Sequence, residues 1–89
     1  MKAVITVVGK DKVGILAEIS AICAEYNINI LEVTQSVLDN LFCMIMICDI
    51  SKISIEFTKF ASIVDDKAKS CNLQIHTMHE DIFNSMHNI

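Results

Sequence analysis

The sequence predicts an α+β protein with a ferredoxin-like βαββαβ fold, in which two helices cover one face of a four-stranded antiparallel sheet and a short C-terminal helix follows. The spacing of apolar residues switches between two and about 3.6 in the order strand, helix, strand, strand, helix, strand. The 89 residues include no proline and only two glycines, so we expect one domain spanning residues 1–89 without a linker. Right-handed crossovers place the first and third strands in the centre of the sheet.

Residues 2–8 are apolar and mostly β-branched, which predicts the first strand. A helix is expected to begin near Ile15, because apolar residues recur at helical spacing from there, and Asn27 is expected to end it. The apolar stripe of this helix comprises Ile15, Leu16, Ile19, Ile22, Cys23 and Tyr26.

A β-hairpin is expected next, with strands over residues 29–38 and 41–49 and a tight turn at Asp39 and Asn40. The third strand is apolar on both faces: Leu41, Cys43, Ile45 and Ile47 alternate with Phe42, Met44, Met46 and Cys48. The two helices cover only one face of the sheet. We therefore expect either the C-terminal helix or a second subunit to cover the other face.

Ser51 or Ser54 is expected to cap the second helix, and Lys67 and Lys69 favour its C-terminal end. The apolar stripe of this helix comprises Phe57, Phe60, Ala61, Val64, Ala68 and Cys71. Residues 73–78 are expected to form the fourth strand. Residues 80–89 predict a short amphipathic helix, whose apolar side comprises Ile82, Phe83, Met86 and Ile89.

Composition excludes several classes of protein. The net charge is −4 and all seven basic residues are lysine, which disfavours direct binding of nucleic acid. The longest strongly apolar run is too short to cross a membrane. Because the first strand begins almost at Met1, we expect no secretion signal, and the cysteines form no Cys-x-x-Cys pair. We therefore expect a cytoplasmic protein with reduced cysteines at positions 23, 43, 48 and 71.

Three other functions known for this fold lack their signatures. A metal carrier needs a thiolate pair in the first loop, which has no cysteine, and His76 and His79 should face opposite sides of a strand. An RNA-binding domain needs aromatic residues on the central strands, where only Phe42 is present. A phosphatase needs arginine to cradle phosphate, and no nucleophile lies near a base. We therefore expect no enzyme, no metal site and no cofactor.

The first loop carries the clearest functional signal, Gly9-Lys-Asp-Lys-Val-Gly-Ile-Leu16, with Asn29 fifteen residues after Gly14. Backbone N–H groups at the start of a helix can hold a carboxylate, Asp11 can accept from an ammonium group, and Asn29 can bond either group. Each residue also has a purely structural interpretation. Asp11 can cap the helix, Gly14 can serve a turn or a close approach of helix and strand, and Asn29 can satisfy backbone groups.

This loop, the helix after it and the Asn27-Ile-Asn-Ile30 entry to the second strand resemble an ACT domain over essentially the whole chain. The two ends of the chain resemble in particular a bacterial family of stand-alone ACT proteins, similar to the regulatory half of glycine-cleavage repressors. The resemblance implies a homodimer that binds amino acids or related small molecules at the subunit interface. Carried over by position, the ligand contacts are Asp11, Val13, Gly14, Ile15, Ile28, Asn29 and Ile30.

The position of Asp11 is often asparagine in serine-binding members, so the sequence leaves the ligand open. The hypothesis is a cytoplasmic homodimer or tetramer that senses an amino acid or related metabolite and regulates a protein partner in trans. The alternative is a structural dimer that binds protein and no metabolite.

Overall fold

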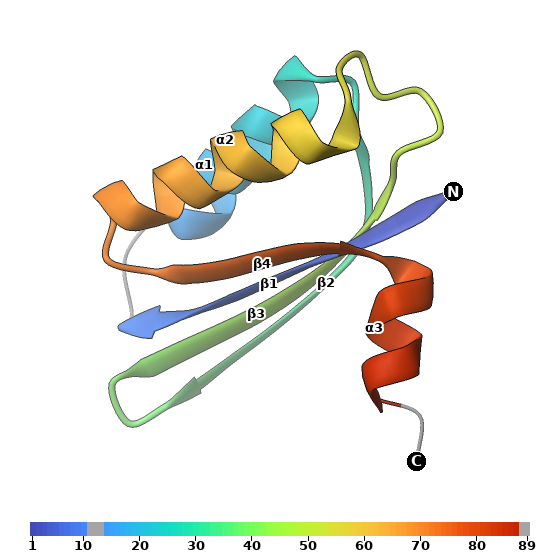
Figure 1. Cartoon of the computed structure of the whole chain (residues 1–89). Helices are drawn as coiled ribbons and strands as arrows, with labels where there is room; N and C mark the ends of the chain where they lie inside the picture. The colour runs from blue at the N-terminus through green and yellow to red at the C-terminus, as the bar shows by residue number, and fades with distance from the viewer. Residues whose placement is uncertain (11–13, 88–89) are drawn as a thin grey trace.

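The computed structural model describes residues 1–10 and 14–87, and it has the predicted ferredoxin-like topology (Figure 1). The elements are β1 (Lys2–Lys10), α1 (Ile15–Glu25), β2 (Asn29–Leu38), β3 (Leu41–Asp49), α2 (Phe57–Ser70), β4 (Gln74–His79) and α3 (Glu80–His87). The strands form one antiparallel sheet in the order β2-β3-β1-β4, so β1 and β3 are central as predicted. The predicted C-terminal helix is also confirmed, as α3.

The core lies between the sheet and the two helices α1 and α2, which share one face (Figure 1). Phe60 of α2 is fully buried at its centre, with its ring 6.4 Å from that of Tyr26 in an edge-on arrangement. The strand residues that face the helices are Ala3, Ile5, Val7, Phe42, Met44, Met46 and Cys48. Alternate positions of the two central strands therefore supply most of the sheet's share of the core.

The first helix begins at Ile15 as predicted, but the capping residues of both helices differ from the candidates in the sequence. Gly14, in the left-handed conformation (φ 88°), is the N-cap of α1 in place of Asp11, which lies outside the described residues. Glu56 is the N-cap of α2 and makes no side-chain capping bond, so the prediction of Ser51 or Ser54 was wrong. Ser51 instead bonds Asp49, and the backbone N–H of Ser54 donates to the carbonyl of Tyr26.

The conformation of Gly14 gives a direct prediction. A Cβ built at this position meets nothing within 4 Å, so the close-approach interpretation does not apply, and any cost of a side chain is backbone strain. We expect Gly14→Ala to lower the free energy of unfolding by about 1 kcal/mol. Gly14→Asn should cost less, because asparagine tolerates this conformation. Urea unfolding measures both, and equal stability of Gly14→Ala and the natural chain would contradict a need for left-handed backbone.

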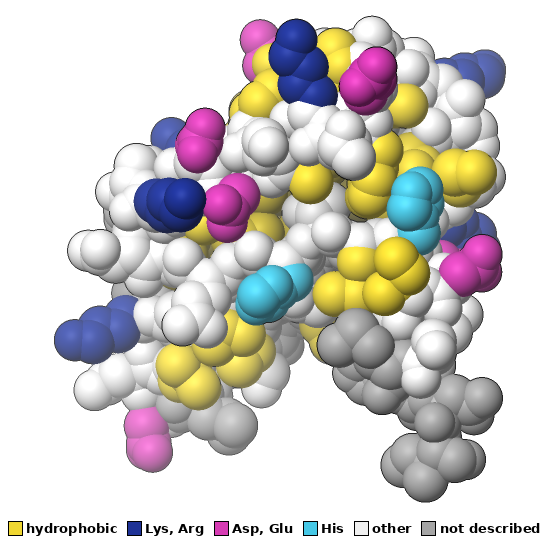
Figure 2. Space-filling model, viewed as in Figure 1, with side chains coloured by type: hydrophobic (Ala, Val, Ile, Leu, Met, Phe, Trp, Pro, Cys, Tyr) yellow, Lys and Arg dark blue, Asp and Glu magenta, His cyan; other side chains and the backbone are white. Residues whose placement is uncertain are grey.

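The face of the sheet opposite α1 and α2, here called the open face, is covered in part by α3. This helix contacts β1 and β4 (Figure 1), and Val4 on the open face is only 1% exposed. Ile45 on the same face remains 40% exposed, and Figure 2 shows the surface hollowed between the hairpin end of the sheet and α3. The C-terminal helix therefore covers the open face only in part.

None of the helices in the described part of the chain is both long enough and apolar enough to cross a membrane.

Candidate functional site

The structure places the predicted ligand contacts in different environments. Ile15 and Ile28 are buried, at 2% and 6% exposure, and belong to the core. Ile30 is half-buried against the core, whereas Gly14 and Asn29 are exposed. The other two predicted contacts, Asp11 and Val13, lie outside the described residues. Of the described contacts, Gly14 and Asn29 therefore have the accessibility that a ligand needs.

Gly14 and Asn29 lie at opposite ends of the sheet within one chain. Lys2 and Asn29 both pair with Asp49 at one end, whereas Gly14 follows the last residue of β1 at the other end. The length of β1 separates these ends by about 27 Å at 3.4 Å per residue. A single copy therefore does not bring the two halves of the predicted site together.

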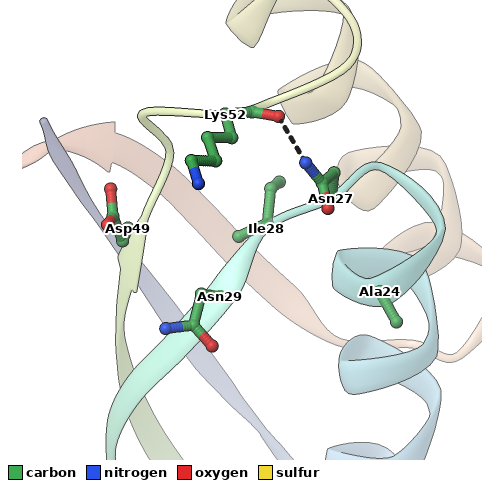
Figure 3. Close-up of a pocket in the computed structure, with 6 residues that line it drawn as sticks. All are labelled: Ala24, Asn27, Ile28, Asn29, Asp49 and Lys52. Atoms are coloured by element: carbon green, nitrogen blue, oxygen red, sulfur yellow. Dashed lines mark hydrogen bonds between the residues drawn. The ribbon is translucent and has the colours of Figure 1, made fainter.

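A polar pocket of about 220 Å³ surrounds Asn29, where α1 ends, β2 begins and β3 ends (Figure 3). The residues that line this pocket, here called the Asn29 pocket, are Ala24, Asn27, Ile28, Asn29, Asp49 and Lys52. In Figure 3 the Lys52 side chain extends over the space between Asp49 and Ile28. The pocket thus combines one carboxylate, one ammonium group and two side-chain amides.

Hydrogen bonds fix the carboxylate of Asp49 and the backbone carbonyl of Lys52. The carboxylate of Asp49 accepts from the Ser51 hydroxyl at 2.6 Å and from the Ser51 backbone N–H at 2.9 Å. These two bonds hold the pKa of Asp49 below its ordinary value, so Asp49 is an anion at neutral pH. Asn27, in a left-handed conformation after α1 as expected of a helix stop, donates from its side-chain amide to the Lys52 carbonyl at 2.9 Å.

This set of groups matches the chemistry of a free amino acid. The ammonium group of a zwitterion needs an acceptor such as Asp49, and its carboxylate needs donors such as the Lys52 ammonium and the Asn29 amide. Of the residues that line the pocket, the sequence predicts Asn29 and Ile28 as ligand contacts but not Asp49, Lys52 or Asn27. The pairing of Asp49 with Asn29 in the hairpin is the signal that links them, and it depends on the register of the strands.

The bond between Ser51 and Asp49 gives a prediction about pH. A carboxyl group whose pKa is depressed in the folded state stabilises the fold above its unfolded pKa, and that contribution is lost as the pH falls through the folded pKa. Ser51→Ala removes the hydroxyl donor, so we expect the pKa of Asp49 to rise towards its ordinary value of 3.8. The variant should then lose this contribution at a higher pH than the natural chain.

Titration of the Asp49 carboxyl carbon by NMR measures this change. Ser62→Ala, at an exposed position of α2, is the matched control and should leave the titration of Asp49 unchanged. Unchanged titration of Asp49 in Ser51→Ala would show that the hydroxyl does not set its pKa.

No cluster of three or more potential metal ligands occurs among the residues that the structure describes. His79 faces the helices, with its ring 4.3 Å from that of Phe57, whereas His76 lies on the open face. The two histidines therefore lie on opposite faces of the sheet, as the alternation along a strand predicts.

Comparison with known proteins identifies the family. The family model of the ACT domain matches residues 2–78. A UPF0237 protein of Clostridium perfringens is 48% identical over 89 residues that cover the whole of both chains. An ACT domain protein from Streptococcus pneumoniae is similar in structure, with a TM-score of 0.80 and 38% identity over 93% of each chain.

A putative glycine cleavage system transcriptional repressor has a similar fold, with a TM-score of 0.71 and 20% identity; the match covers 85% of this chain and 43% of the repressor. That likeness concerns the fold alone, whereas the family model and the full-length relatives concern the sequence itself. The chain therefore belongs to the ACT-domain family.

Proposed function

We propose that this protein is a regulatory ACT domain that binds an amino acid or a closely related metabolite at the interface of a homodimer. In this proposal it acts in the cytoplasm on a protein partner in trans and catalyses no reaction. The observation that carries the proposal is the Asn29 pocket, in which Asp49, Lys52 and Asn29 offer opposite charges and an amide within about 220 Å³. The four free cysteines support a reducing compartment.

The β2 edge supports a dimer. Three of its apolar side chains are exposed: Leu31 by 44%, Val33 by 37% and Val37 by 52%. A long edge strand with exposed apolar side chains is prone to pair with another strand. The other edge strand, β4, has six residues against ten in β2 and leads directly into α3. The β2 edge is therefore the better candidate for the interface.

Antiparallel pairing of two β2 strands would assemble both halves of the predicted site. In such a dimer the start of β2 in one copy lies beside the end of β2 in the other. The end of β2 lies at the same end of the sheet as Lys10, after which the first loop and Gly14 follow. Gly14, just beyond this end of β1, would therefore lie at the same end of the joined sheets as the Asn29 pocket of the neighbouring copy.

Titration calorimetry with the common amino acids tests the proposal. For the amino acid that binds, we expect Lys52→Met and Asn29→Ala each to weaken the affinity by about tenfold or more, because each removes a donor to the ligand carboxylate. Lys59→Met is the matched control, since Lys59 is an exposed lysine on α2 outside the pocket. It should leave the affinity unchanged.

Two results would contradict the proposal: no amino acid binds, or Lys52→Met and Asn29→Ala bind as the natural chain does. The structural alternative, a dimer that binds protein and no metabolite, would then account better for the fold and the exposed β2 edge.

A further inference from the structure

The open face carries a second cavity, a groove of about 350 Å³ between the sheet and α3. Its floor is formed by Thr6 and Val8 of β1 and by Cys43 and Ile45 of β3. All four are at least partly exposed, and Figure 2 shows a hollow beside α3 on this side of the molecule. This cavity is here called the open-face groove.

The walls of the open-face groove come from β4 and α3. His76 and Met78 line it from β4, and Phe83 lines it from α3. Thr6 pairs with both Ile45 and His76, so these three residues form one row across the sheet. None of the lining residues belongs to the Asn29 pocket, so the two cavities are separate sites.

The chemistry of the groove differs from that of the Asn29 pocket. Among the described residues, no lysine, aspartate or glutamate lines it, and their polar side-chain groups in the groove are the Thr6 hydroxyl, the Cys43 thiol and the His76 imidazole. A zwitterion or a phosphate would lose water here without gaining an opposite charge, which is costly. The volume lies within the range of small-molecule sites, which combine apolar walls with a few polar groups.

We propose that the open-face groove is a binding site for a small, uncharged, mostly apolar ring compound with one or two hydrogen-bonding groups. The ring packs against Ile45, Met78 and Phe83, and the polar group meets Thr6 and His76. The alternative is that a second copy packs its sheet against the open face. Packed sheets meet over broad, continuous surfaces, whereas α3 forms a wall on one side of this groove, so a small molecule fits it better. This site is independent of the amino-acid site proposed above.

A compound bound in the groove would join α3 to the sheet. It would touch Phe83 on one side and the β1, β3 and β4 side chains on the other, whereas the main contacts of α3 itself are with β1 and β4. Ligand binding would therefore fix the position of α3, which gives the site a way to change the surface seen by a partner.

The neutral fluorophore N-phenyl-1-naphthylamine is a suitable probe, and the cysteines of the chain report where it binds. Cys43 lies in the groove, whereas Cys71 is half-buried beside Glu18 on the helical side, and Cys23 and Cys48 are fully buried. We expect a saturable rise in fluorescence and about tenfold slower alkylation of Cys43 by N-ethylmaleimide at saturation. Alkylation of Cys71 should not change.

A variant that fills the groove completes the test. Val8→Trp places an indole in the groove and should weaken binding of the probe by about tenfold or more. Ser62→Trp, at an exposed position of α2, controls for the added tryptophan. Thr6→Val keeps the shape of the groove and removes a hydroxyl, so it tests the polar contact if Val8→Trp does not fold.

Several results would overturn the proposal. These are probe binding that does not saturate, equal slowing at Cys43 and Cys71, and unchanged affinity in both Val8→Trp and Thr6→Val. Dissociation of the dimer by Val8→Trp in sedimentation would also overturn it, because the groove would then be an interface between copies.

Discussion

Replacing Val33 and Val37 together by lysine should convert the proposed dimer into monomers, with a dissociation constant raised by about a hundredfold or more. Both side chains are exposed on the β2 edge, at 37% and 52%, and pair with Met46 and Phe42 on the helical face of the sheet. The variant removes two apolar side chains from each copy and adds positive charges along the strand at which the two copies are proposed to pair. Sedimentation equilibrium measures the change.

The control for this double variant is Ile82→Lys. Ile82 is exposed by 52% on α3, so the control adds a lysine at an equally exposed apolar position away from β2. It should leave the dimer intact. If the double variant remained dimeric, or if Ile82→Lys dissociated the dimer, the interface would not lie at the β2 edge. If the double variant also lost its affinity for the amino acid, the Asn29 pocket would be shown to depend on the dimer interface.

Phe60→Ala should have the largest effect on stability, a loss of about 3–5 kcal/mol in the free energy of unfolding. The Phe60 side chain is fully buried between the helices and the sheet and lies 6.4 Å from Tyr26 and 6.5 Å from Phe57, ring centre to ring centre. Its removal leaves a cavity that the surrounding core cannot fill. For a small domain this is a large share of the total stability of about 5–15 kcal/mol.

Urea unfolding of Phe60→Ala measures this loss. Ile63→Ala, on the same helix at a half-buried position, is the matched control and should cost clearly less. A cost for Phe60→Ala no greater than that of the control would contradict the central place of Phe60 in the core.

The order of the elements was predictable because each has a distinct apolar period. The apolar residues on both faces of residues 41–49 also predicted that the C-terminal helix or a second subunit covers the open face, and α3 covers part of it. How much remains open could not be predicted, because it depends on where α3 packs. The open-face groove is a consequence of that packing.

The Asn29 pocket could not be predicted because a single β-bulge sets its geometry. Leu31 has no partner on β3, so the register shifts between Ile30 and Glu32. Without this bulge, a two-residue turn would place Asn29 opposite Ile50 and reverse the faces of Ile30 and Asn29. With the bulge, Ile30 packs against the core and Asn29 lies opposite Asp49.

The failed prediction for the cap of α2 has a related cause. Ser51 was a reasonable capping residue by type, but the end of β3 holds it through two bonds to Asp49. The N-terminal ammonium group also donates to the Ser51 hydroxyl at 3.0 Å, from a residue 50 positions away. Local sequence contains no sign of such a distant donor.

The central claim is that two copies join through their β2 edges. Hydrogen exchange along β2 tests this claim most directly. In the dimer, the amides of Asn29–Leu38 that point away from β3 should be protected, and dilution to the monomer should release them. The account predicts protection along β2 that depends on protein concentration. Rapid exchange of these outward amides at every concentration, with concentration-dependent protection of β4 instead, would contradict it.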